Sequence, residues 1–530
     1  MKKKEMSGPE KHELVQECIN AIGEKYTELC FKHDGCRILQ ALVKFGNRPQ
    51  RELVVEKLKD EYVTLMQQKY SHYLASKLYL YAPLDSQKEF FRKQIAAQMN
   101  KLVMHAYGSE VVEYIYTQCQ SDKERREVVF SLYGNYSLVL DEVFGDDSRQ
   151  KDQQNALSVF MQQKPQIASN ILTKMEPMVQ KLVDKGNQRH TFVQAILLDY
   201  VECQAQQDMD KVKQVAEQMK EALPALLASK EGLRVACALF NLLEAKDRKL
   251  VIKSLPVGEM ATNRIAHLFL IHVANNLDDT QLTKKKLMHE VLIKIDDNID
   301  DANFRNILNA ALQPLEVEQN ASGDMQYKRN SFIQADELQA MSLLLSKSTS
   351  KKDRKVRAKE LFKIVQKPLE MFFEEKLSFY LLDNKPNTVL KHLFVGVAGL
   401  GEAGSSDLVD EMVRQVQKPY EDQGVKNLLL GHPVIHRMLK DMIKAEVAGA
   451  GGEGKLKFSS TMAKVTLKHF EAAISGRGVF ILLELVENEA TKSLVSKQLK
   501  EQQKVLIACA KKDKSAKGLA VLLKKVKELS

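Results

Sequence analysis

A nine-residue segment near the start of the chain returns at an almost constant interval. Lys32–Gln40 is followed 36 residues later by Gln68–Ser76, and a third copy, His105–Glu113, begins 37 residues after the second. Each copy places two buried-type residues between positions that could face a ligand. Periods of this size are typical of solenoids in which each helical unit buries one face on the next. We therefore predict an all-α solenoid of stacked repeats.

The spacing of apolar residues supports helices throughout. In stretches such as Glu52–Leu58 apolar residues lie three and four apart, and alternating runs bounded by turn pairs are rare. Polar breaks such as Phe45–Pro49 and Asp184–Asn187 mark expected helix ends. Two longer interruptions, Pro314–Asp336 and Ala445–Lys455, are expected to be flexible loops inserted between repeats.

Charge indicates the class of partner. The 530 residues carry a formal net charge of +10, which favours an anionic partner, nucleic acid before a membrane surface. No apolar run approaches the roughly 18 residues that a membrane span needs, and the polar start argues against a secretion signal. The seven cysteines are scattered and lack a CxxC pair, so we expect reduced thiols, no disulfide framework, no metal and no cofactor.

One set of side chains has the chemistry of a base-reading site. Cys36, Arg37 and Gln40 share a helix face. Arg37 offers a flat guanidinium that can stack on a base, and Cys36 and Gln40, one turn apart, can meet the Watson–Crick edge of that base. This frame resembles the second helix of a Pumilio repeat, in which such a trio reads one RNA base. The resemblance implies repeats of three helices each.

Along the chain the trios lose this code. The same frame selects His72, Tyr73 and Ser76; Ser109, Glu110 and Glu113; His190, Thr191 and Gln194; Leu233, Arg234 and Cys237; Ala266, His267 and Leu270; and then poorer copies that begin at Arg305, Asn387, Ile435 and Gly478. The side chains among them that could stack on a base are Arg37, Tyr73, Arg234, His267 and His436. They are mostly not in adjacent repeats, so a continuous readout of about eight bases is not expected.

Recognisable repeats with a degraded code resemble the divergent Puf-A branch of the Pumilio family. The stretches that carry the resemblance are Leu29–Asp34, Lys69–His72, Val112–Tyr114, Leu132–Asn135, Lys246–Lys249 and Gly431–Pro433. It extends from about Lys11 to Leu529. It implies about eleven repeats in a bent or L-shaped array, RNA and DNA binding with little sequence preference, and a place in the nucleolus. The implied role is pre-rRNA processing and large ribosomal subunit assembly, with pre-ribosomal RNA or the pre-60S particle, double-stranded nucleic acid and ribosome assembly proteins as partners.

The expected organisation follows from the repeats and their interruptions. It comprises N-terminal repeats in 11–145, middle repeats in 146–314, a polar insertion loop in 315–345, and C-terminal repeats with basic terminal helices in 346–530.

Two basic clusters suggest binding that does not depend on base identity. Lys351–Lys359 distributes cations over several faces of a helix, and Lys492–Ser530 holds eleven lysines against three acids. Such segments suit contact with phosphates, although lysine-rich faces are also common as solvated surface. The residues predicted to contact nucleic acid are Cys36, Arg37, Gln40, His72, Tyr73, Ser109, Glu113, Arg234, Lys351, Lys352, Arg354, Lys355, Arg357, Lys511, Lys512, Lys514 and Lys517.

Motifs for other chemistry lack their context. Gly399–Gly404 satisfies GxGxxG but follows a helical pattern, and Gly449–Lys455 has the spacing of a phosphate loop with Leu456 in place of Ser or Thr. We therefore expect no nucleotide site and no enzyme. Two alternatives stay open: a sequence-specific translational regulator that reads messenger RNA, and an armadillo-like scaffold that holds peptides.

Overall fold

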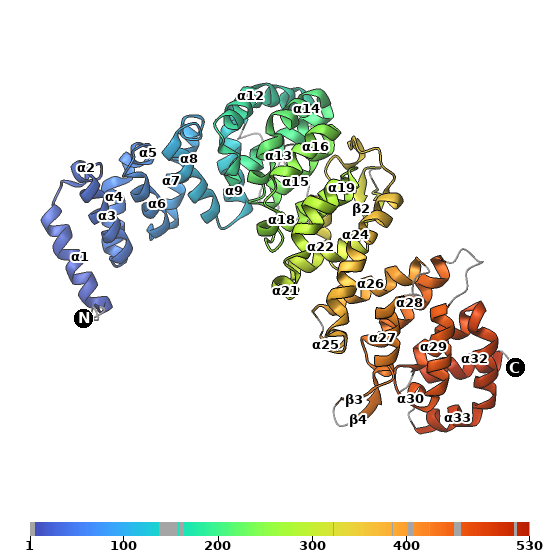
Figure 1. Ribbon diagram of the computed structural model, residues 1–530. Coiled ribbons are helices and arrows are strands. Elements are labelled where there is room, and N and C mark those ends of the chain that lie inside the picture. Colours follow the sequence, from blue (N-terminus) through green and yellow to red (C-terminus); the bar gives the residue numbers. More distant parts are fainter. Residues whose placement is uncertain are drawn as a thin grey trace. The chain divides into compact units, whose positions relative to one another are not determined.

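Helices form nearly all of the regular structure in the computed structural model (Figure 1). The structure describes residues 6–136, 157, 164–321, 323–383, 385–400, 406–422, 425–449, 457–512 and 517–528. The chain forms two compact units. Unit 1 comprises 1–254, 320–326 and 336–349, and unit 2 comprises 255–319, 327–335 and 350–530. The expected middle segment, 146–314, is thus divided between the units after Ser254.

Unit 1 is built from helices that follow one another at repeat spacing. They are α1 (Gly8–Ile22), α2 (Tyr26–Leu29), α3 (His33–Phe45), α4 (Arg48–Leu58), η1 (Lys59–Glu61), α5 (Tyr62–Met66), α6 (His72–Tyr81), α7 (Asp85–Leu102), α8 (Ala106–Gln118), α9 (Asp122–Phe130), η2 (Ser131–Tyr136), α12 (Pro165–Asp184), η3 (Asn187–Arg189), α13 (Thr191–Gln207), α14 (Met209–Met219), η4 (Lys220–Leu226), α15 (Lys230–Leu242), α16 (Ala245–Ser254) and η6 (Leu345–Lys347).

Unit 2 continues the helical pattern and adds short strands. Its elements are α17 (Val257–Met260), α18 (Ala266–Asn276), α19 (Thr280–Leu282), η5 (Thr283–Met288), α20 (His289–Leu292), α21 (Ile295–Asn298), α22 (Ala302–Leu312), β1 (Val317–Gln319), α24 (Arg354–Glu374), α25 (Leu377–Leu382), α26 (Asn387–Gly399), α27 (Asp407–Gln415), β3 (Pro419–Asp422), β4 (Val425–Leu428), η8 (Leu429–Gly431), α28 (Ile435–Gly449), α29 (Lys457–Lys468), α30 (Phe470–Ile474), α31 (Val479–Glu487), α32 (Glu489–Glu501), α33 (Gln503–Lys512) and α34 (Lys517–Glu528). β3 and β4 pair antiparallel, from Pro419 opposite Leu428 to Asp422 opposite Val425.

Equivalent close contacts define the repeat register in unit 1. A Cβ on Gly35 would lie 2.3 Å from the carbonyl oxygen of Leu29, and one on Gly108 would lie 2.8 Å from that of Leu102. At the corresponding position of the repeat between them, the Ser71 hydroxyl donates to the Leu65 carbonyl at 3.1 Å. In these three repeats, the start of α3, α6 or α8 therefore packs against the preceding helix, which is why glycine or serine occupies this position.

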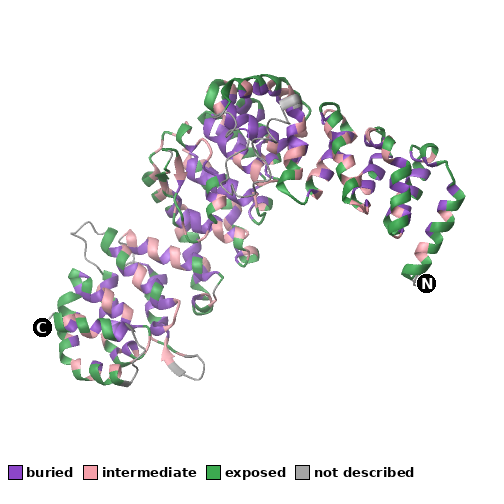
Figure 2. Ribbon diagram, turned by 180° about the vertical axis from the view of Figure 1, so that it is seen from behind, coloured by how far each residue is buried: buried purple, intermediate pink, exposed green. Residues whose placement is uncertain are grey.

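Helix starts follow the sequence signals closely. At the break Phe45–Pro49, α3 ends at Phe45, and α4 begins with a reciprocal capping box between Asn47 and Gln50. The Gln50 amide also donates to the carbonyl oxygen of His12 at 2.8 Å, which joins α4 to α1. Figure 2 shows buried residues on the faces where helices of each unit meet and exposed residues on the outer faces. Local caps and shared apolar faces thus hold each unit together.

The segment expected to be an insertion loop contains regular structure. β1, β2 (Met325–Tyr327), α23 (Ala335–Ala340) and η6 lie within 315–345. The side chain of Tyr327 is 3% exposed, and the amide of Asn276 donates to its hydroxyl at 2.6 Å. An aromatic anchor with a buried hydrogen bond orders this segment, although its composition is polar. In the second interruption, α28 extends to Gly449, and 450–455 lie outside the described residues.

Within the described ranges, we find no helix whose length and apolar character would let it cross a membrane. GxGxxG begins at Gly399, the last residue of α26, so the one motif glycine that the structure describes belongs to a helix end. That context lacks the preceding strand of a dinucleotide site.

Candidate nucleic-acid interface

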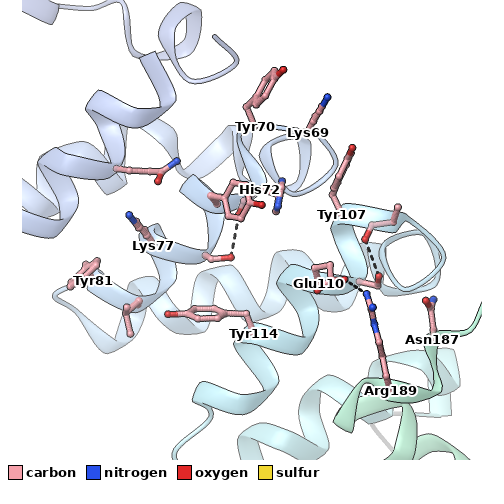
Figure 3. A pocket seen from close by; sticks show the side chains of 16 residues that line it. Lys69, Tyr70, His72, Lys77, Tyr81, Tyr107, Glu110, Tyr114, Asn187 and Arg189 are labelled. Atoms are coloured by element: carbon pink, nitrogen blue, oxygen red, sulfur yellow. Dashed lines mark hydrogen bonds and ion pairs between the residues drawn. The ribbon is translucent and has the colours of Figure 1, made fainter. Parts of the chain in front are cut away.

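A hollow of about 1010 Å³ opens on unit 1 (Figure 3). Its walls come from α3, the turn before α6, α6 itself, α8 and η3. The lining residues are Gln40, Lys69, Tyr70, His72, Tyr73, Ser76, Lys77, Leu80, Tyr81, Ala106, Tyr107, Ser109, Glu110, Tyr114, Asn187 and Arg189. The hollow therefore contains the whole second trio, together with members of the first and third trios: His72, Tyr73, Ser76, Gln40, Ser109 and Glu110.

Aromatic rings form the floor and rim of this hollow. Tyr73 is 60% exposed and Tyr70 is 43% exposed. The buried ring of His72 lies 3.8 Å from that of Tyr73 and stacks on that of Tyr107, with a centroid separation of 4.9 Å and an interplanar angle of 15°. His72 is held in turn by the Gln68 carbonyl, 3.1 Å from its Nδ1. The outer ring, that of Tyr73, is thus a supported flat surface on which a base could stack.

The hollow is electropositive. Three cationic side chains and one carboxylate line it. Arg189 pairs with Glu110 across the gap between η3 and α8, as Figure 3 shows, and both side chains are exposed, so the pair contributes little to stability. Lys69 and Lys77 form no ion pair among the described residues, and Lys69 Nζ lies 5.5 Å from the Tyr70 ring centroid. These two lysines can therefore meet phosphate groups.

The first predicted trio divides into a buried and an exposed part. Cys36 is 1% exposed, and its thiol donates to the carbonyl oxygen of Cys30. Burial raises the pKa of the Cys36 thiol to about 11, so the thiol stays neutral and keeps its hydrogen bond to the Cys30 carbonyl. Arg37 is exposed and Gln40 is half-buried. The predicted contact of Cys36 with a base would require the thiol to leave Cys30, whereas Arg37 is presented to solvent as expected.

In the third trio, the polar groups are used within the protein. Ser109 is 2% exposed, and its hydroxyl donates to the Ala106 carbonyl at 3.2 Å. The Glu113 carboxylate accepts hydrogen bonds from the Thr191 hydroxyl at 2.8 Å and from the Phe192 amide at 3.2 Å. Glu113 thus caps α13, where a carboxylate also meets the positive end of the helix dipole. The predicted contact of Ser109 and Glu113 with nucleic acid would therefore have to replace hydrogen bonds made within the protein.

The frame drawn through His190 is displaced in the structure. Thr191 is the first residue of α13, and the Gln194 amide donates to the Gln188 carbonyl at 3.0 Å. That contact spans six residues, like the contact from Ser71 to Leu65. His190 and Thr191 therefore precede the turn that Cys36 occupies in α3. His190 is buried, and burial lowers its pKa.

Arg234 is engaged by a neighbouring helix. Its guanidinium forms an ion pair with the largely buried carboxylate of Glu202 on α13, and 22% of the Arg234 side chain is exposed. The structure therefore brings Arg234 to the surface of α15 as a paired group. Stacking on a base would compete with this ion pair.

The first basic cluster is largely structural. Arg357 is 4% exposed and donates to the Leu277 and Asn275 carbonyls at 3.0 Å each and to the Asp278 carboxylate at 2.7 Å. Lys352 pairs with Glu360. Arg357 therefore cannot reach a phosphate, because its donors close the C-terminal end of α18. This corrects the prediction for Arg357 and leaves Lys352 paired.

Other members of that cluster differ from one another. Lys355 is exposed, as is the side chain of Lys351, whose backbone amide donates to the Asp278 carboxylate at 3.0 Å. Arg354 is half-buried and lies 3.5 Å from the Asn276 side-chain oxygen. Lys351 and Lys355 thus remain available to phosphate.

The second basic cluster is only partly described. Lys511 is exposed near the end of α33. Lys514 falls outside the described residues, and so do the side chains of Lys512 and Lys517. Their predicted contacts stay predictions.

Several lining residues were absent from the sequence prediction. Tyr70 and Tyr107 occupy the same repeat position, two residues before the trio, and Lys69 and Lys77 flank the trio of α6. The repeated tyrosine was the signal that could have found them. Arg189 had no such signal, because η3 meets α8 only through the tertiary fold. Among the described residues, no cluster of three or more His, Cys, Asp or Glu could hold a metal ion.

The arrangement suits one kind of chemistry. Exposed Tyr73 and Arg37 can stack, and Lys69 and Lys77 can neutralise phosphates, whereas three of the predicted readers of base edges, Cys36, Ser109 and Glu113, bond to the protein itself. Stacking and phosphate contact tolerate any base.

Comparison with known proteins agrees with the fold. Residues 325–451 match the CPL (NUC119) domain. The human protein Pumilio homolog 3 is 25% identical over 99% of this chain and 78% of its own length. The crystal structure of human Puf-A superposes with a TM-score of 0.75 at 22% identity over 99% of this chain and 97% of that one. The crystal structure of human Puf-A in complex with DNA superposes with a TM-score of 0.73 at 21% identity, over 98% of this chain and 96% of that one. By a CPL domain match, by relatives at about 25% identity along its whole length and by a shared helical-repeat fold, the chain is similar to the Puf-A type of Pumilio-repeat protein.

Proposed function

We propose that this protein binds RNA, and double-stranded nucleic acid or DNA, through phosphate and stacking contacts with little preference for sequence. Its cellular role in this proposal is pre-rRNA processing and large ribosomal subunit assembly in the nucleolus, on pre-ribosomal RNA and together with ribosome assembly proteins. The role in ribosome assembly rests on the resemblance to the Puf-A branch.

One observation carries the binding mode. At these trio positions of unit 1, the polar groups already form hydrogen bonds within the protein: Cys36 with Cys30, Ser109 with Ala106, and Glu113 with the start of α13. A side chain that is already hydrogen-bonded gains little by exchanging its partner for a base edge. Base identity therefore has little influence on affinity, while lysines such as Lys69 and Lys77 attract the phosphate backbone of nucleic acid of any sequence.

The relatives support the same class of ligand. A human Puf-A structure was determined in complex with DNA. The net charge of +10 on this chain is consistent with a polyanionic partner. Neither observation requires a defined base sequence.

Salt titration tests the binding mode. Fluorescence anisotropy with one structured and one random RNA should give dissociation constants within about fivefold of each other and a steep negative slope of log affinity against log salt, about 0.7 per phosphate contact on single strands. Lys69→Ala with Lys77→Ala should reduce that slope by about 1.4. Lys25→Ala, an exposed lysine before α2, is the matched control. A flat slope would overturn the electrostatic mode.

Crosslinking in cells tests the cellular role. Ultraviolet crosslinking followed by sequencing should recover pre-ribosomal RNA as the main bound RNA. Recovery of messenger RNA that shares one short motif would instead favour the translational regulator. Retention of peptide partners and loss of all RNA crosslinks would favour the scaffold.

A further inference from the structure

An exposed apolar surface lies where α24 ends and α25 follows. Met371 is 61% exposed, Phe379 is 60% exposed and Leu382 is 46% exposed. Phe372 and Tyr380, both half-buried, lie between them. These five residues are called the α24–α25 patch. Single exposed apolar residues are normal, but a contiguous group marks an interaction surface.

The patch is held rigid by ring contacts. The Tyr380 ring lies 5.4 Å from that of Phe372 and 5.4 Å from that of Phe379, between centroids. It also meets Phe373 edge-on at 5.2 Å, and Phe373 is fully buried. The exposed rings are therefore tied to the core of unit 2. A partner would lose little entropy in ordering them, which favours binding.

The rim of the patch is acidic. Between 374 and 383 there are three acids and one lysine, and 295–301 holds four aspartates and no cation. Burial, and then the carboxylates of Asp296 in α21 and Asp300 after it, raise the pKa of Tyr380, so these acids lie near the Tyr380 ring. Asp296, Asp300, Glu374 and Glu375 form no ion pair among the described residues.

Unpaired acids around apolar side chains select the partner by charge. The acidic rim would repel phosphates, so this surface does not suit nucleic acid or an anionic membrane. Cationic side chains would gain an attraction to Glu374, Glu375 and the aspartates at 296 and 300, while the centre needs apolar anchors.

From this surface we propose that the α24–α25 patch docks a segment of a partner protein in which apolar anchor residues are flanked by lysine and arginine. Phe379 and Met371 contact the anchors, and Asp296, Asp300 and Glu374 face the cations. This site is separate in residues and in charge from the hollow of unit 1, and it goes beyond the proposed function.

A pair of peptides tests the proposal on the full chain. The probe is a labelled amphipathic helix of about 16 residues with leucine on one face and lysine on the other, and its counterpart carries glutamate in place of lysine. Fluorescence anisotropy should show binding of the lysine peptide and at least about tenfold weaker binding of the glutamate peptide. Phe379→Ser with Met371→Ser should lower the affinity for the lysine peptide by about tenfold or more.

Two further variants separate the contributions. Leu494→Ser, at a residue 47% exposed on α32, should leave peptide binding unchanged. Asp296→Lys with Asp300→Lys should weaken binding of the lysine peptide and strengthen binding of the glutamate peptide. All replaced side chains of the patch are exposed, so thermal unfolding should match the parent.

Four results would overturn the proposal. Equal binding of both peptides would exclude charge selection, and unchanged binding by the Phe379 and Met371 variant would exclude the patch. Sedimentation that shows self-association lost in the same variant would assign the surface to a second copy of the chain. A parallel fall in RNA affinity would assign it to nucleic acid, whereas failure of RNA binding alone would leave this proposal standing.

Discussion

The carboxylate of Glu113 accepts a hydrogen bond from the hydroxyl of Thr191 at 2.8 Å. The same carboxylate accepts a second hydrogen bond from the backbone amide of Phe192 at 3.2 Å. One side chain thus joins α8 to the first turn of α13, across 78 residues of sequence. A position that the repeat frame assigns to a base edge serves instead as a helix cap.

Replacing Glu113 should therefore affect stability more than binding. Glu113→Ala removes the cap of α13, and we expect a loss of about 1 to 2 kcal/mol, read as a lower urea midpoint. RNA affinity should stay within about twofold, because no base contact is lost. A large change in affinity for guanine-containing RNA at unchanged stability would show that Glu113 reads bases.

Tyr73 should matter for single strands. With 60% of its surface exposed beside His72, its ring can stack on an unpaired base. Tyr73→Ala should weaken the binding of single-stranded RNA by about 1 to 3 kcal/mol, measured by fluorescence anisotropy. Tyr73→Phe keeps the ring and should retain affinity. Duplex RNA should be nearly unaffected, because its bases are already stacked; equal losses for duplex and single strand would contradict stacking.

Two cations on α24 should behave oppositely. Arg357 is buried and bonds to Asp278 and two carbonyls, so Arg357→Ala strands buried acceptors and should cost about 3 to 5 kcal/mol, seen as a lower unfolding temperature. Lys355→Ala removes an exposed charge and should leave stability unchanged while reducing the salt slope of RNA binding by about 0.7. If Arg357→Ala kept full stability and changed only affinity, the structural role of Arg357 would be wrong.

His392 should couple stability to pH. Burial, followed by Lys391, lowers the pKa of His392 to about 4, and its Nδ1 lies 2.9 Å from the Asn309 side-chain oxygen on α22. The unfolded chain binds this proton near pH 6.5 and the folded chain does not. Stability is thus complete above pH 6.5 and falls toward pH 4, by at most about 1.4 kcal/mol per pH unit.

Urea midpoints across that pH range give the measurement. His392→Gln removes the titrating group and can still donate to Asn309, so its midpoints should fall less between pH 6.5 and pH 4 than those of the parent. Parallel curves for the two proteins would show that His392 titrates normally in the folded state.

From α1 to α8, the repeat register and the helix boundaries could be predicted from the sequence because both depend on local residues. Gly35 and Gly108, two repeats apart, make equivalent contacts with Leu29 and Leu102. The expected helix break at Asn47 holds the capping box of α4. The exposure of Arg37 and Tyr73 also followed from the frame. Each of these features is decided within one repeat, where spacing and turn chemistry suffice.

Partners far apart in the chain decided the rest. Whether Arg357 is free depends on Asp278, and whether Glu113 is free depends on Thr191. Likewise, Tyr327 ordered a polar segment by reaching Asn276, and Arg189 joined the hollow through Glu110. A charged or polar side chain looks the same in sequence whether it meets solvent or a buried partner.

The sequence by itself determined a stack of helical units with a cationic balance. Only the tertiary structure decided which polar side chains remain available to a ligand, because hydrogen bonding and burial are satisfied by neighbours that folding brings together.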